Sequence, residues 1–357
     1  MIGRTASRLL FCFYYSLYMQ MHGKRELLAR VCSRTGLTRI LESLPQRRAL
    51  IILNYHRLGN ADETPFDSGV FSATAEQFDS QIAFFKRRFH MSTLGEVFAM
   101  IGGNAPRGTS VLITFDDGYR DNYTLAFPIL RAHGVQGVFF LPTAFIGTGK
   151  LPWWDLIAYI VKQSDKKRIH LEYPEPVILD LENDGKRYAC MQILRLFTQP
   201  AVKDQERFIA DLEKACEVLR PENATERCFL DWHEAREMLQ HGMAFGSHTH
   251  RHEILTKLSP ELQRVEARHS RGILERELKR RIDILAYPVG LKHCFSVDTV
   301  RALEQAGYRA AFSFYGGSNR PGVMQPFDLR RCSVVDQSHA RLRFQAALGA
   351  FTGTGWF

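Results

Sequence analysis

The chain has 357 residues, 45% of them hydrophobic, and a formal net charge of +9 at pH 7. This length and composition supply enough apolar side chains for one large folded core, and they exclude a repeat or low-complexity protein. The seven cysteines form no Cys-x-x-Cys pair, which argues against a thiolate zinc site and favours a reducing, cytoplasmic location.

Most of the positive charge lies in residues 1–48, where nine Lys or Arg against two Glu give +7. Within this segment, residues 9–21 are uncharged and rich in aromatics, but the run is shorter than the ~20 apolar residues that a membrane span requires. Bulky residues at 18–21 offer no signal-peptide cleavage site. We expect a basic amphipathic segment on an anionic membrane surface, or else a helix packed against the folded domain. No recognised module indicates nucleic-acid binding.

Two apolar runs predict buried strands that end at polar side chains. Residues 50–53 lead to His56, and residues 111–113 lead to the adjacent carboxylates Asp116 and Asp117. The second run is rich in β-branched residues and breaks at a glycine, as expected where a buried strand enters a loop. In α/β folds, such strand ends carry the chemistry.

The following segments alternate between helix and strand. A helix is predicted over 121–132, a strand over 135–141, a second helix over 259–279 and a strand over 282–285. Alternating units of this kind indicate a parallel sheet. Between them, residues 151–228 read as a charge-rich helical insertion.

The insertion begins with Trp153 and Trp154. Loops after barrel strands build the substrate mouth of such folds, so these rings could stack on sugars. They could equally anchor the core of the insertion. The sequence leaves both interpretations open.

Two histidines, His248 and His252, stand four residues apart after another short apolar stretch. On a helical turn this spacing places both imidazoles on one face. Together with one carboxylate, they offer a divalent metal three ligands and leave positions open for water and substrate.

The Thr-Phe-Asp-Asp-Gly run at 114–118 and the His-Thr pair at 248–249, followed by His252, resemble the motifs of the polysaccharide deacetylase (NodB-homology) family. The resemblance covers residues 49–336 and implies an incomplete (β/α) barrel. It implies that Asp117, His248 and His252 bind a divalent metal, with Zn²⁺ favoured over Co²⁺ or Ni²⁺. Asp116 would be the general base, and Thr249 would support the site without binding the metal.

The family's third motif, Arg-x-Pro-Tyr-Gly or close to it, corresponds here to residues 285–290, where the Arg is missing. The resemblance implies that Tyr287, Pro288 and Val289 contact substrate, with the Val289 amide as an oxyanion donor, because a backbone donor does not depend on side-chain identity. Arg330 or Arg331 could replace the missing Arg that orients Asp116. The alternative is that both belong to a solvated strand end.

The family's last motif, a Leu-x-His that supplies the general acid, is not found near the carboxyl end, and we expect residues 337–357 to be a tail. His56, which precedes the other motifs, is the candidate general acid. This order resembles the permuted branch of poly-N-acetylglucosamine deacetylases. The alternative is a histidine packed at a strand end.

The resemblance implies a carbohydrate de-N-acetylase that hydrolyses the linear amide of N-acetylated amino sugars, in an oligo- or polysaccharide or its lipid-linked precursor. A deformylase of a lipid-linked amino sugar would use the same metal chemistry. A non-catalytic carbohydrate-binding protein at a membrane surface is a third possibility, although the presence of Asp116 argues against it. We expect a cytoplasmic protein, peripheral at the inner face of the membrane.

Overall fold

The computed structural model describes residues 24, 26–104, 108–182, 185–199, 201–221, 227–334 and 338–352. The apolar run at 9–21 lies outside these residues. Among those described, no helix combines the length and hydrophobicity needed to cross a membrane.

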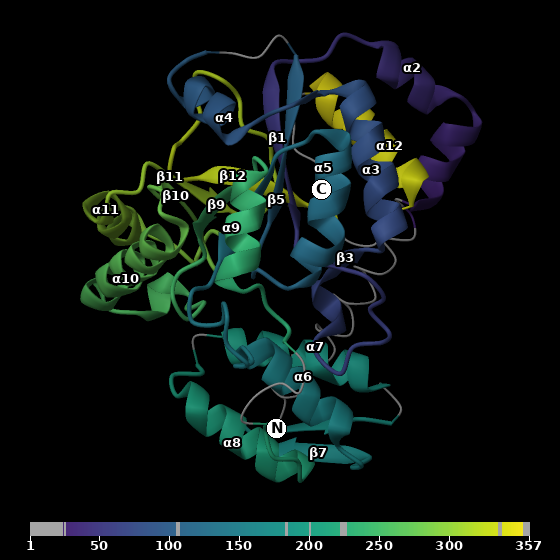
Figure 1. Ribbon diagram of the computed structural model, residues 1–357. Helices are drawn as coiled ribbons and strands as arrows, with labels where there is room; N and C mark the ends of the chain where they lie inside the picture. Colours follow the sequence, from purple (N-terminus) through teal and green to yellow (C-terminus); the bar gives the residue numbers. More distant parts are fainter. Residues whose placement is uncertain are drawn as a thin grey trace.

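A barrel of parallel strands forms the centre of the molecule (Figure 1). In sequence order around the barrel, the strands are β1 (Ala49–Tyr55), β5 (Thr109–Phe115), β6 (Gly137–Leu141), β9 (Ala244–Ser247), β10 (Ile284–Ala286), β11 (Ala310–Ser313) and β12 (Leu329–Ser333). β1 closes the ring by pairing with both β5 and β12. Because helices cover the outside and side chains fill the inside, β1 and β5 are buried at every position. The (β/α) barrel is confirmed, with seven strands in place of eight.

Helices surround the barrel, and most of them begin at a residue whose side chain caps the first turn. They are α3 (Ala75–Arg88), α4 (Leu94–Ile101), α5 (Phe127–His133), α9 (Trp232–Gln240), α10 (Pro260–Leu278) and α11 (Val297–Ala306). Ser259 caps α10 as its sequence indicates. The helix predicted at 121–132 starts as a π-helical turn, Asn122–Ala126, before α5. Apart from the strands of the insertion, the described residues form three short strands outside the ring: β2 (Arg57–Leu58), β3 (Phe71–Ala73) and β4 (His90–Met91), of which β4 pairs with β5.

The insertion folds around a core of its own at one end of the barrel (Figure 1). It comprises α6 (Trp153–Gln163), β7 (Arg168–Leu171), β8 (Val177–Asp180), α7 (Gly185–Thr198) and α8 (Gln205–Cys216). The insertion is mostly helical, as expected, and it also holds an antiparallel hairpin of β7 and β8 that the sequence did not reveal. Alternate residues of β7 are buried against the helices, a two-residue period that charged neighbours obscure in the sequence.

The two ends of the described chain pack together. Helix α12 (His339–Thr352) lies against α2 (Leu37–Ser43), and Arg343 of α12 makes two hydrogen bonds to Glu42, of 3.0 and 2.8 Å. The expectation of a tail at 337–357 is wrong for residues 339–352, because Leu342, Ala346 and Ala350 are buried in the main core.

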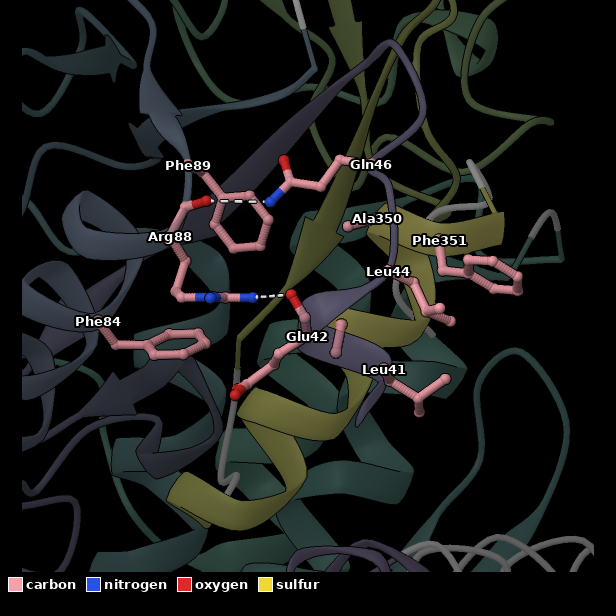
Figure 2. A pocket seen from close by; sticks show the side chains of 10 residues that line it. Leu41, Glu42, Leu44, Gln46, Phe84, Arg88, Phe89, Ala350 and Phe351 are labelled. Atoms are coloured by element: carbon pink, nitrogen blue, oxygen red, sulfur yellow. Dashed lines mark hydrogen bonds between the residues drawn. The ribbon is translucent and has the colours of Figure 1, made fainter. Parts of the chain in front are cut away.

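The segment before β1 is also fixed to the barrel. Figure 2 shows a small pocket where Arg88 of α3 donates to the carbonyl oxygen of Glu42 and Gln46 donates to that of Arg88. Residues 26–34 are helical, with Ala29 and Cys32 buried. Residues 26–48 are thus packed against the folded domain, which is one of the two arrangements expected for this segment. Whether residues 1–23 bind a membrane stays a prediction.

Candidate metal centre and active site

The polar side chains singled out in the sequence gather at the carboxyl ends of the barrel strands. His56 follows β1, Asp116 and Asp117 follow β5, and His248 follows β9. The chain turns sharply after β5, where Asp117 and Gly118 have φ angles of 71° and 66°. A Cβ atom on Gly118 would lie 2.6 Å from a methyl carbon of Leu141, so only glycine fits this turn.

Asp117, His248 and His252 form a buried group whose potential ligand atoms all lie within 4.8 Å of one another. Asp117 Oδ1 is 3.6 Å from His248 Nε2 and 3.5 Å from His252 Nε2. This oxygen is buried and has no hydrogen-bond partner among the described residues. An orphaned carboxylate oxygen facing two imidazole nitrogens fits a divalent cation, and the two-nitrogen, one-oxygen donor set suits Zn²⁺.

The protonation states of this group also suit a cation. Burial lowers the pKa of His248 and of His252, which keeps both imidazoles neutral. Burial and the neighbouring Asp116 raise the pKa of Asp117 well above its usual range. A bound cation would reverse that shift by stabilising the carboxylate, so metal binding would release a proton.

Asp116 is held by a buried arginine. Arg331 on β12 is fully buried, and its two terminal nitrogens lie 2.6 and 2.9 Å from the two carboxylate oxygens of Asp116. Burial alone would raise the pKa of Asp116, but Arg331, with His248 and His56, outweighs it and holds the pKa well below its ordinary range. Asp116 is therefore ionised at neutral pH.

Of the two candidate arginines, the structure brings only Arg331 to the site. Neighbouring residues of a strand point to opposite faces, and Arg330 lies on the other face, half exposed and 3.9 Å from Asp328. Arg331, on the last strand of the barrel, thus makes the contact to Asp116 that the sequence analysis left open between the two arginines.

Asn54 also belongs to this cluster, and sequence reasoning missed it. Its amide nitrogen donates to Asp116 Oδ2 at 3.0 Å, while its oxygen accepts from Arg331 at 2.7 Å and from the Thr114 hydroxyl at 2.8 Å. The only signal in the sequence was that Asn54 is a polar residue at the end of the apolar run before His56. Such a residue needs partners, and here Asp116, Arg331 and Thr114 provide them.

His56 lies beside Asp116, with its Nε2 3.9 Å from Asp116 Oδ2. The Ser72 hydroxyl accepts from its backbone N–H, and the Asn122 side chain donates to its carbonyl oxygen. Burial lowers the pKa of His56 to about 4; Asp116 opposes this shift, whereas Arg331 adds to it. The imidazole is therefore neutral at pH 7 in the metal-free protein.

The third-motif region departs from the expectation at Tyr287, and whether the Val289 amide faces substrate stays a prediction. Tyr287 is buried in the core, stacks on Phe295 and donates to the carbonyl oxygen of Phe327, so its hydroxyl is not free for substrate. Pro288 accepts from the Gly290 N–H in a tight turn centred on Val289, whose φ is 62°. Positive φ at a β-branched residue is strained, and such strain clusters at functional sites.

Thr249 and His250 lie in sequence between the candidate ligands His248 and His252, and their side chains have different surroundings. Thr249 is buried with φ 63°, and its hydroxyl has no hydrogen-bond partner among the described residues. His250 turns away: its Nδ1 is 2.8 Å from the Thr143 hydroxyl and its ring contacts His269. The supporting role of Thr249 stays a prediction, and His250 does not belong to the group of Asp117, His248 and His252.

The polysaccharide deacetylase family model matches residues 103–171 and 183–311, more than half of the chain. The chain belongs to the polysaccharide deacetylase family. The recognition made from the two motifs is therefore confirmed.

One curated protein of similar sequence is a distant relative of the chain. The Bacillus subtilis (strain 168) protein "Putative polysaccharide deacetylase YxkH" is 24% identical over 218 residues, covering 61% of this chain and 47% of that protein. The chain thus spans about half the length of this curated relative.

Two solved structures share the barrel of this deacetylase-family chain. IcaB from Ammonifex degensii is 17% identical with a TM-score of 0.54, covering 87% of this chain and 100% of that chain. The Streptococcus pyogenes deacetylase PplD, in complex with acetate, is 18% identical with a TM-score of 0.52, covering 80% of this chain and 91% of that chain. At these identities the likeness shows a common fold.

We expect His248→Ala and His252→Ala each to lose most of the bound metal, because the remaining two ligands cannot hold the ion. Metal content after dialysis, measured by plasma mass spectrometry, checks this. His250→Ala is the matched control and should keep its metal. Full metal occupancy in both ligand variants would contradict the assignment.

The His56 imidazole should stay neutral in the metal-free folded protein down to about pH 5, and its midpoint should return to about 6.5 in urea. The reason is that burial lowers its pKa to about 4, so it becomes charged only in acid. An NMR titration of the imidazole checks this. A folded-state midpoint near 6.5 would show that His56 is not desolvated as the structure indicates.

Proposed function

We propose that this protein removes N-acetyl groups from amino sugars of a polysaccharide or its lipid-linked precursor, with the help of a divalent metal. Membership of the polysaccharide deacetylase family makes it a hydrolase of the carbohydrate de-N-acetylase class. One observation carries the mechanism: Asp116, clamped by Arg331, lies beside the buried group of Asp117, His248 and His252.

Asp117, His248 and His252 would hold the metal, which when bound polarises the amide carbonyl and lowers the pKa of water. Asp116 would take the proton from that water. Three hydrogen bonds, two from Arg331 and one from Asn54, fix the orientation of its carboxylate. Because these bonds also make Asp116 a weak base, proton transfer depends on the water being acidified.

His56 would protonate the departing amine. It is neutral at rest, so the proton would reach it by way of Asp116, whose Oδ2 is 3.9 Å from His56 Nε2. The Val289 amide, held in its strained turn, would donate to the developing oxyanion.

The catalytic interpretation gains support over a non-catalytic one from Arg331. The absence of the third-motif Arg was the reason to consider a protein that only binds carbohydrate. Arg331 supplies an equivalent contact to Asp116, and a binding protein has no need of a carboxylate fixed in this way.

We place the protein at the inner face of the membrane, where lipid-linked sugars would be accessible. Two features support this placement: the charge of +7 over residues 1–48 and the exposed apolar side chains Leu27, Leu28, Val31 and Ile40. A basic segment with an apolar face is attracted to anionic lipid.

Asp116→Asn should keep the metal but lose ~10²–10⁴-fold in turnover, the usual contribution of a general base. Asp117→Asn should lose both metal and turnover. Acetate release from N-acetylglucosamine oligosaccharides, together with metal content, separates the two. If Asp116→Asn hydrolysed substrate at nearly the parent rate, the base would have to be another residue.

His56→Ala should retain its metal and lose ~10²-fold or more in turnover, because the leaving amine would no longer be protonated. The same substitution at His339, which begins α12, is the control and should have little effect. Loss of activity in His339→Ala with normal activity in His56→Ala would restore the usual order of motifs and remove His56 from the mechanism.

A further inference from the structure

The two candidate metal-binding histidines are held in different ways. His248 Nδ1 donates to the carbonyl oxygen of Ala286 at 2.8 Å, which directs its Nε2 toward Asp117. His252 Nδ1 is buried and has no hydrogen-bond partner within the described part of the chain. Ligating histidines generally donate their second ring nitrogen to a neighbouring group. Another kind of contact must therefore orient the His252 ring.

That contact is the packing of Trp154. The ring centroids of Trp154 and His252 are 4.4 Å apart, with an angle of 58° between the ring planes. His252 also contacts the His248 ring at 4.6 Å. Trp154 is 4% exposed, so its position is set by the protein and not by solvent.

A chain of hydrogen bonds fixes Trp154 in turn. Its indole N–H donates to the Tyr119 hydroxyl at 2.7 Å, and that hydroxyl donates to Asp155 Oδ2 at 2.8 Å. Asp155 is fully buried, and its other oxygen accepts from the backbone N–H of Asp67 at 3.0 Å. The Tyr119 ring stacks on Phe229. Each member of the chain is thus held by at least one further contact.

We propose that Trp154 is a positioning residue for the metal site: it orients His252 by ring packing, and Tyr119 and Asp155 lock it in place. The proposal rests on the metal site of the proposed function. Trp154 and Asp155 belong to the first turn of α6, so the insertion contributes to the metal site as well as covering the barrel.

Zinc affinity tests this role without any substrate. Trp154→Leu should bind Zn²⁺ about 10–100-fold more weakly in competition with a chromophoric chelator, the loss usual when the support of a ligand is removed. Trp153→Leu is the matched control. The Trp153 ring centroid is 6.4 Å from that of His252, and the Trp153 ring stacks on Phe197. Parent affinity in Trp154→Leu, or an equal loss in Trp153→Leu, would overturn the proposal.

Tyr119→Phe provides a second test that does not depend on Trp154→Leu folding. It removes one hydroxyl and keeps the ring, so we expect a smaller loss of Zn²⁺ affinity and a changed visible spectrum of the Co²⁺-loaded protein. Tyr123→Phe is the control, since its hydroxyl donates to Glu237. A Tyr119→Phe protein identical to the parent in both measurements would show that the Tyr119 hydroxyl does not hold Trp154 in place.

The two proposals can fail separately. A parent protein that binds Zn²⁺ tightly, loses affinity on Trp154→Leu and releases no acetate would refute the proposed function and leave the positioning role intact. Acetate release by the parent protein, together with unchanged Zn²⁺ affinity in Trp154→Leu, would support the proposed function and refute the positioning role of Trp154.

Discussion

The buried ion pair between Arg331 and Asp116 is the interaction on which the rest of the site depends. Two charges removed from water are costly unless their hydrogen-bonding groups are satisfied. Here Arg331 also donates to the carbonyl oxygen of Ser313 and to Asn54, and Asn54 donates back to Asp116. The pair joins β12 to the end of β5, and it forms only because β1, which carries Asn54, lies between those strands and closes the barrel. Removing one partner of such a pair typically destabilises a protein by ~3–5 kcal/mol.

Closure of the barrel also gives the two adjacent carboxylates different environments. Asp116 faces Arg331 and is held ionised. Asp117 has positive φ and faces two neutral imidazoles, and its Oδ1 accepts no hydrogen bond from the residues that the structure describes. Their pKa values shift in opposite directions. Titratable neighbours whose environments push their pKa values apart commonly have separate catalytic roles. The structure therefore supports one carboxylate acting on protons and the other binding a cation.

The features that the sequence revealed are those that local patterns encode. The apolar runs of β1 and β5, the capped helix α10 and the spacing of His248 and His252 are all readable within a few residues. These patterns, with the family resemblance, were sufficient to predict the barrel and the grouping of Asp117, His248 and His252. They also predicted that Asp116 and His56 lie in one site, and the structure places His56 Nε2 3.9 Å from Asp116 Oδ2, although 60 residues separate the two in sequence.

What the sequence did not reveal depends on long-range contacts. The choice between Arg330 and Arg331 is settled only by which face of β12 points into the barrel. Asn54 has a role because Asp116 and Arg331 reach it from other strands. Helix α12 shows little separation of polar and apolar faces in its sequence and is fixed by Glu42, some 300 residues away. The contact between Trp154 and His252 joins segments almost 100 residues apart, which no periodicity can indicate.

A metal titration of the metal-depleted protein, with acetate release as the readout, tests metal-dependent deacetylation most directly. Zn²⁺ or Co²⁺ would be added in steps to the full chain, and acetate released from N-acetylglucosamine oligosaccharides would be measured at each step. We expect no acetate release without metal, a rise in proportion to the metal bound, and saturation at about one ion per chain, because one group of three ligands holds one ion. Acetate release from the metal-free protein, or none from the saturated protein, would contradict this expectation.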